Sequence, residues 1–80
     1  MITGNEASLK ARDYFESVMG VNAVIGFMVM SLKKNVLETE WDVSCSFFPS
    51  PGARQRLGYL VKVDSEDGSI KETEIVVVKD

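Results

Sequence analysis

The sequence contains no histidine and only one cysteine, and these two shortages exclude several kinds of active site. Without histidine, neither a Ser-His nor a Cys-His nucleophilic dyad can be assembled. The usual zinc sites draw on cysteine and histidine, so they are excluded as well. The Walker A loop and the Gly-x-Gly-x-x-Gly turn of nucleotide-binding proteins are also missing. We therefore expect no enzyme, no cofactor and no metal site.

Long apolar segments are equally scarce. The longest uncharged run, residues 17–32, contains glycine, asparagine and serine and falls short of the ~20 apolar residues that cross a bilayer. The first residues lack the basic region and apolar core of a signal peptide. The lone Cys45 cannot form an intrachain disulfide, which fits a reducing compartment. We expect a cytoplasmic protein with no membrane partner.

Basic charge is scattered along the chain. Nine lysines and arginines stand against twelve acidic residues, for a net charge of −3. Nucleic-acid binding needs a basic face that neutralises phosphates, so we expect no nucleic-acid partner. The one local concentration is Arg54 and Arg56, in the loop after Pro49-Ser50-Pro51-Gly52. These arginines are candidate contacts for a carboxylate, a phosphate or a protein partner, with a solvated loop tip as the alternative.

The chain length predicts a single domain, residues 1–80. A chain of this size buries only about 60–65% of the surface that its unfolded form exposes. Its apolar content of 45% and charged content of 26% are typical of a soluble globular domain. Domains near this size limit often gain stability by packing on a second copy, so we expect a homodimer.

The hydrophobic pattern predicts one helix followed by four strands. Apolar residues recur at spacings of three and four over residues 5–19, with Asn5 or Ser8 as the N-cap and Gly20 after the last turn. Alternating or continuous apolar runs predict strands at about 23–32, 37–48, 55–64 and 70–78. The elements indicate an α+β domain, with the N-terminal helix packed on a four-stranded antiparallel meander sheet.

The strand patterns also predict which side chains are buried. The face covered by the helix should carry Trp41, Val43, Tyr59 and Val61, with Cys45 as a small buried hydrophobe. Residues 24–32 are apolar at nearly every position, which favours a strand buried on both faces, with a helix as the alternative. Lys33-Lys34-Asn35 is the expected turn after it. One face of that strand has no cover within the chain, which supports the homodimer.

Two groups of carboxylates are candidate sites. Glu38, Glu40 and Asp42 alternate along the second strand, where residues on one face lie ~6.6 Å apart, a separation found in glycosidases. A solvated face that pairs with Lys62 or Lys71 is the simpler interpretation. Residues 64–67 are acidic and precede Gly68, but their spacing and flanking strands do not fit a calcium loop. We predict a hairpin turn there, because glycine adopts a positive φ without steric cost.

Several of these features together resemble a known family. Trp41-x-Val43, a proline-containing loop with arginine, Tyr59-x-Val61-x-x-Asp64 and Gly68-x-Ile70 resemble the pattern of gas vesicle protein O-type domains. The pattern is similar to the broader PepSY-like group, in which a helix precedes a three-stranded meander. The resemblance covers about residues 7–75. It implies an accessory or structural protein rather than a catalyst, and it carries over no active-site residues.

The leading functional hypothesis is a non-catalytic accessory or protein-interaction domain that self-associates. The second is a small-molecule-binding domain with a pocket between helix and sheet, lined by Tyr14, Phe15, Trp41 and Tyr59. An ordinary aromatic core is the alternative for these four rings. Trp41 and Tyr59 join the two loop arginines as candidate ligand or partner contacts. An enzyme that uses the second-strand carboxylates is the third hypothesis.

Overall fold

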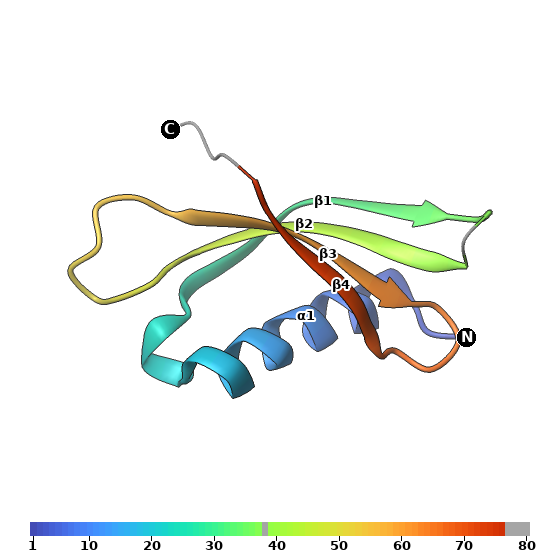
Figure 1. The fold of residues 1–80 in the computed structure, drawn as a ribbon, viewed down its shortest axis with the longest axis horizontal. Coiled ribbons are helices and arrows are strands. Elements are labelled where there is room, and N and C mark those ends of the chain that lie inside the picture. The colour runs from blue at the N-terminus through green and yellow to red at the C-terminus, as the bar shows by residue number, and fades with distance from the viewer. Residues whose placement is uncertain (38, 77–80) are drawn as a thin grey trace.

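The computed structural model describes residues 1–37 and 39–76 and confirms the predicted α+β fold (Figure 1). Its elements are α1 (Gly4–Met19), the 3₁₀ helix η1 (Val21–Ala23), β1 (Ile25–Asn35), β2 (Glu40–Phe48), β3 (Leu57–Asp64) and β4 (Ile70–Val76). Each strand pairs antiparallel with the next, in the order β1-β2-β3-β4. The parts of the predicted strands at residue 38 and at residues 77–78 lie outside the described residues.

Thr3 caps α1, in place of the predicted Asn5 or Ser8. Its hydroxyl accepts a hydrogen bond from the Glu6 N–H at 3.1 Å, and the Glu6 carboxylate accepts one from the Thr3 N–H at 3.1 Å. This capping box satisfies two donors at once, which a cap further along the chain would leave unpaired. Asn5 already lies within the helix, and the Ser8 hydroxyl donates to the Gly4 carbonyl.

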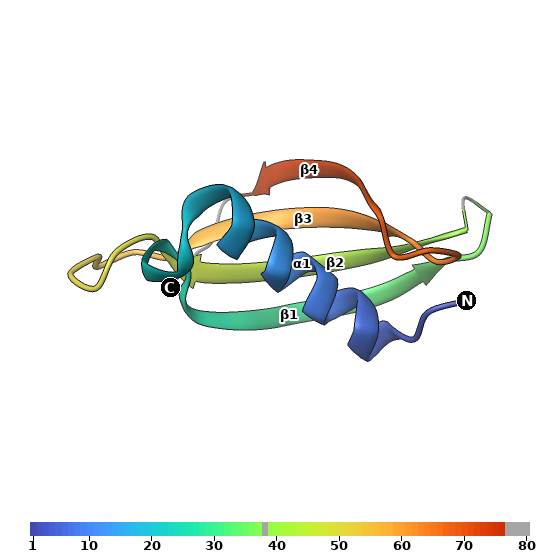
Figure 2. The same ribbon diagram turned by 90° about the horizontal axis from the view of Figure 1, so that it is seen from below.

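α1 crosses one face of the sheet diagonally, from β1 towards β3 (Figure 2). Its buried stripe consists of Ala7, Ala11 and Phe15. The two alanines permit a close approach, and the Phe15 ring lies 5.1 Å from the Phe47 ring and 4.7 Å from the Tyr59 ring, between centroids. The covered face is the predicted one, and its strand residues include Trp41, Val43, Tyr59 and Val61.

β1 continues beyond its predicted end at residue 32. Residues 33–35 pair with the start of β2, so the turn predicted at Lys33-Lys34-Asn35 is wrong, and the chain turns at residues 36–37. The physical reason is that the Lys34 side chain has a partner in the extended conformation. The Lys34 ammonium lies 5.0 Å from the centroid of the Trp41 ring, a cation–π contact that a turn would not provide.

β1 is an edge strand, so the chain itself does not provide the burial on both faces predicted for residues 24–32. Met28, Met30 and Leu32 remain 46%, 42% and 38% exposed. A meander places its first strand at the edge of the sheet, where a single helix covers it only in part. Two β-bulges interrupt the pairing of β1, one that includes Gly26 at φ +64° and one at Met30. Bulges of this kind hinder the addition of a further strand.

The capping box generates a stability prediction. Replacing Thr3 by alanine should lower the free energy of unfolding by about 1 kcal/mol, because the N–H of Glu6 loses its acceptor. Asn5→Ala is the control: it lies inside the helix, where alanine is the better helix former, so the change should stay within about 0.5 kcal/mol. Urea denaturation followed by circular dichroism measures both variants. A loss in Asn5→Ala that matches the loss in Thr3→Ala would contradict this cap.

Candidate functional site

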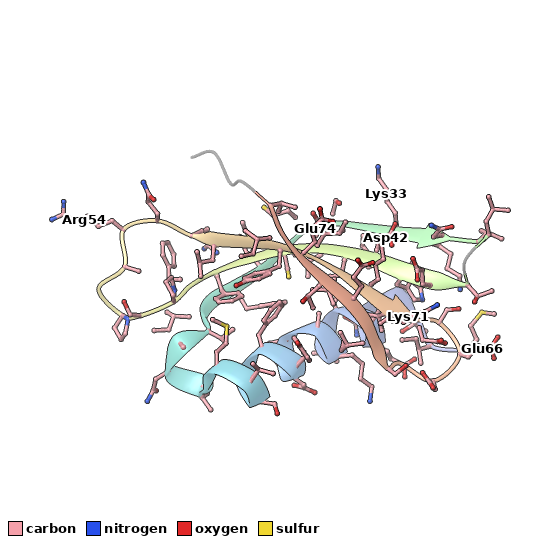
Figure 3. All side chains as sticks on the ribbon, viewed as in Figure 1. Lys33, Asp42, Arg54, Glu66, Lys71 and Glu74 are labelled. Atoms are coloured by element: carbon pink, nitrogen blue, oxygen red, sulfur yellow. The ribbon has the colours of Figure 1, made fainter. Side chains whose placement is uncertain are left out.

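The four residues predicted as ligand or partner contacts do not form one site. Trp41 and Tyr59 lie on the helix-covered face of the sheet. Arg54 is exposed in the loop between β2 and β3, at the end of the molecule away from the β1–β2 turn (Figure 3). Arg56 lies over the opposite face of the sheet, where it contacts Ser46. The sequence could not show this separation, because it depends on which face each strand presents.

The aromatic residues fill the space between helix and sheet. The Trp41 Nε1–H donates to the Ile2 carbonyl at 3.2 Å, which ties the indole to the segment before α1. The Tyr59 ring stacks on Phe47, with 5.7 Å between centroids, and Tyr14 packs edge-on against Phe15 at 5.3 Å. Within the described part of the chain, no pocket separates these rings. The four aromatic residues considered as a pocket lining therefore contribute to the core.

Arg56 joins the β2–β3 loop to β1. Its Nη1 donates to the Gly26 carbonyl at 2.8 Å and approaches the Ser46 carbonyl and hydroxyl oxygens at 3.4 Å. Its guanidinium carbon lies 4.5 Å from the centroid of the Phe48 ring. A Cβ on Gly26 would lie 3.4 Å from an Arg56 nitrogen and 3.5 Å from Phe48, so this glycine leaves room for the arginine. The guanidinium is thus engaged by the chain itself.

No helix covers the other face of the sheet in the part of the chain that the structure describes (Figures 1 and 2). We call it the open face. The end of the open face near the β1–β2 turn is charged, and Lys33 and Asp42 project from it on the side away from α1 (Figure 3). Towards the β2–β3 loop it becomes mostly apolar or small, with Met28, Ser31, Ser44, Ser46, Phe48, Gly58, Leu60 and Val76, although Glu74 on β4 adds a charge there.

A row of four charges crosses all four strands of the open face. Lys33 lies opposite Asp42, Asp42 lies opposite Lys62, and Lys62 lies opposite Glu72. We call these four residues the charge row. Its signs alternate, so each cross-strand pair is attractive. The Lys62 Nζ lies 3.9 Å from a Glu72 carboxylate oxygen.

Lys33 and Asp42 face each other without an ion pair in the described chain. One oxygen of Asp42, Oδ1, is shielded from solvent and has no hydrogen-bond partner among the described residues. Lys33 and Glu72 are not among the candidate site residues predicted from the sequence. The strand register could have identified them. Once the strand bounds are known, the short β1–β2 connection aligns Lys33 with Asp42, and the short β3–β4 connection aligns Glu72 with Lys62.

Glu40 is buried, whereas the sequence predicted a solvated position. Only 2% of the residue is exposed, with Oε1 3.6 Å from the Lys62 Nζ and Oε2 3.4 Å from the Lys71 Nζ. The predicted pairing with Lys62 or Lys71 is confirmed for both lysines. The predicted exposure is wrong because two long side chains converge on the carboxylate and shield it. Glu38, the first carboxylate of the predicted ladder, lies outside the described residues.

The acidic segment before Gly68 forms the predicted hairpin turn. Asp64 Oδ1 accepts a hydrogen bond from the Glu66 N–H at 2.7 Å, and Asp67 Oδ1 accepts one from the Ser69 N–H at 2.8 Å. The Ser69 hydrogen bond holds the pKa of Asp67 below its ordinary value. Gly68 has φ +79°. These carboxylates orient the turn, and no metal-binding cluster occurs among the described residues.

Comparisons with protein-family models, with curated proteins and with solved structures found no match to this chain. The likeness to gas vesicle protein O-type domains therefore stays a resemblance of sequence pattern. Across residues 1–37 and 39–76, no helix is long and apolar enough to span a membrane.

The buried carboxylate of Glu40 generates a second prediction. Glu40→Gln should lower the free energy of unfolding by about 1–3 kcal/mol, because two lysines lose a shielded counter-charge but still reach water. The control is Glu72→Gln, since Glu72 contacts the same Lys62 but its side chain is 64% exposed. Its effect should stay within about 0.5 kcal/mol. Urea denaturation at low protein concentration measures both, and equal losses would show that burial of Glu40 adds nothing.

Cys45 generates a third prediction. It is fully buried, as predicted, and burial raises the pKa of its thiol to about 11 from an ordinary 9.0. The unfolded chain then loses the thiol proton first, so the free energy of unfolding should fall as the pH rises between these values. Over that range, the difference in the free energy of unfolding between the unaltered chain and Cys45→Ala should shrink by about 1.4 kcal/mol per pH unit. A pH-independent difference, or rapid thiol labelling of the folded protein at pH 8, would contradict the burial.

Proposed function

We propose that the protein is a non-catalytic accessory or protein-interaction domain that self-associates as a homodimer. The observation that carries this proposal is the open face, which no helix covers in the described chain and which presents apolar side chains beside a patterned set of charges. When no helix covers one face of a sheet, the side chains on that face are normally polar and in contact with water, so that polar and apolar residues alternate along each strand. Here the alternation fails towards the β2–β3 loop, where Phe48, Leu60 and Val76 are only half-buried.

The size of the surface fits a pairing of two chains. A standard interface uses about 800 Å² from each partner. That is roughly one sixth of the 5029 Å² of accessible surface of this chain. Exposed Met28 adds to the apolar area beside the half-buried residues. When a small domain buries such a surface in a dimer, apolar side chains are removed from water. This burial adds to the small stability that the core of a single chain provides.

The interior supports interaction rather than ligand binding. Phe15, Phe47 and Tyr59 are in mutual contact between helix and sheet, and no pocket is found among the described residues. The carboxylate of Glu40 is enclosed by two lysines, which removes it from the access that a substrate would need. The resemblance to gas vesicle protein O-type domains implies the same class of role. The unpaired Cys45 fits a reducing compartment, and we propose a cytoplasmic location.

Sedimentation velocity tests the self-association directly. We expect the mass to rise from the 8.9 kDa of one chain towards twice that value as the concentration increases. The rise should be visible between about 1 and 100 μM, the range in which moderate-affinity dimers assemble. A single species at the monomer mass over the whole series would contradict the homodimer.

A further inference from the structure

We propose that two copies of the chain pack open face against open face, about a twofold axis that runs parallel to the strands between β2 and β3. This inference rests on the proposed self-association and specifies its surface and its symmetry. Twofold dimers use the same patch on both chains, so the patch must be complementary to itself. The charge row meets this condition in one orientation of the axis.

A twofold rotation about an axis parallel to the strands lays β1 over β4 of the partner subunit and β2 over β3 of the partner subunit. Each cross-strand row keeps its position along the strands and therefore stacks on the same row of the partner. Lys33 then faces Glu72 of the partner subunit, and Asp42 faces Lys62 of the partner subunit. All four contacts across the row join opposite charges. Asp42, which forms no ion pair within the described chain, thereby gains a further cationic neighbour besides Lys33 and Lys62 of its own chain.

A twofold axis perpendicular to the strands has the opposite effect. It lays each strand over the same strand of the partner subunit. A charge row stacked on its copy would then place Lys33 on Lys33 of the partner subunit and Asp42 on Asp42 of the partner subunit. Like charges at such short range oppose association. The alternating signs therefore distinguish the two orientations, although the apolar residues alone would accept either.

The rows next to the charge row fit the same rotation. Ser44, which lies opposite Leu60 within the chain, would face Leu60 of the partner subunit, so a large side chain meets a small one. In the same row, Ser31 would face Glu74 of the partner subunit, whose carboxylate can accept a hydrogen bond from the hydroxyl. In the following row, where Arg56 covers the buried Ser46, exposed Met28 would face Val76 of the partner subunit. Two twisted sheets stack in this aligned way with strand directions within about 30° of each other.

The sheet edges are less suited to pairing. β1 is interrupted by bulges that include Gly26 and Met30, and β4 carries a register shift at Lys71, next to the charged Glu72. Bulges and charged side chains at an edge are the features that prevent strand addition. Stacking on the open face uses side chains rather than unpaired backbone groups, so these obstacles do not apply to it.

A charge-exchange experiment on the full chain tests the geometry. Lys33→Glu places a carboxylate opposite Glu72 of the partner subunit at two symmetric positions, and Glu72→Lys places an ammonium opposite Lys33 of the partner subunit in the same way. Each variant alone should self-associate about tenfold more weakly than the unaltered chain. A one-to-one mixture restores both attractive contacts, so the mixed dimer should form with nearly the original affinity. Native mass spectrometry with one variant labelled with ¹⁵N identifies that dimer.

Two controls carry the same charge changes elsewhere. Arg54→Glu matches Lys33→Glu, and Glu66→Lys matches Glu72→Lys, because both control sites lie in loops at the ends of the molecule (Figure 3). Neither control should alter self-association, and their mixture should gain nothing. Circular dichroism verifies that every variant is folded.

The outcomes separate the two levels of the proposal. If the unaltered chain dimerises and Lys33→Glu and Glu72→Lys dimerise equally well, the open-face geometry is wrong and self-association stands. Protection of β1 amides from hydrogen exchange on dimerisation would then identify edge pairing as the true arrangement. If the unaltered chain stays monomeric, both the proposed homodimer and this geometry are wrong.

Discussion

An α-helix is about 10 Å across, whereas four strands spaced about 4.8 Å apart form a sheet nearly twice as wide. α1 therefore covers only a diagonal band of one face, from β1 towards β3, and the other features of the fold follow from this limit (Figure 2). The aromatic cluster around Phe15 forms beneath the band. Beyond it, Ile75 on β4 remains 70% exposed. The second face has no helix at all in the described chain.

Long polar side chains provide part of the cover that helices do not. Lys62 and Lys71 converge on the Glu40 carboxylate at one end of the open face. At the other end, the Arg56 guanidinium lies over the Phe48 ring and contacts Ser46, which is fully buried. Such side chains shield the strand beneath them with their aliphatic parts while the charged groups reach water. No pocket is found among the described residues of this surface.

In our proposal, the division between the two faces of the sheet also separates stability from function. The helix-covered face contains the buried thiol, the aromatic rings and the apolar side chains that hold the domain together. The open face contains the alternating charges and the apolar residues outside that core. A chain of 80 residues has little room for a deep cavity, so its surface is the natural place for recognition. In the proposed dimer, the charge row sets the geometry more strictly than the apolar residues do.

The order of helix and strands, the turn at Gly68 and the face buried by α1 could all be predicted from the sequence. Each depends on a periodicity or on one residue's backbone preference, and both are local properties. The edge position of β1, the burial of Glu40 and the use of Arg56 within the chain could not be predicted. They depend on which segments become neighbours across the sheet. The sequence by itself determined the elements, whereas the tertiary structure decided the register, and the register brings Lys33, Asp42, Lys62 and Glu72 into one row.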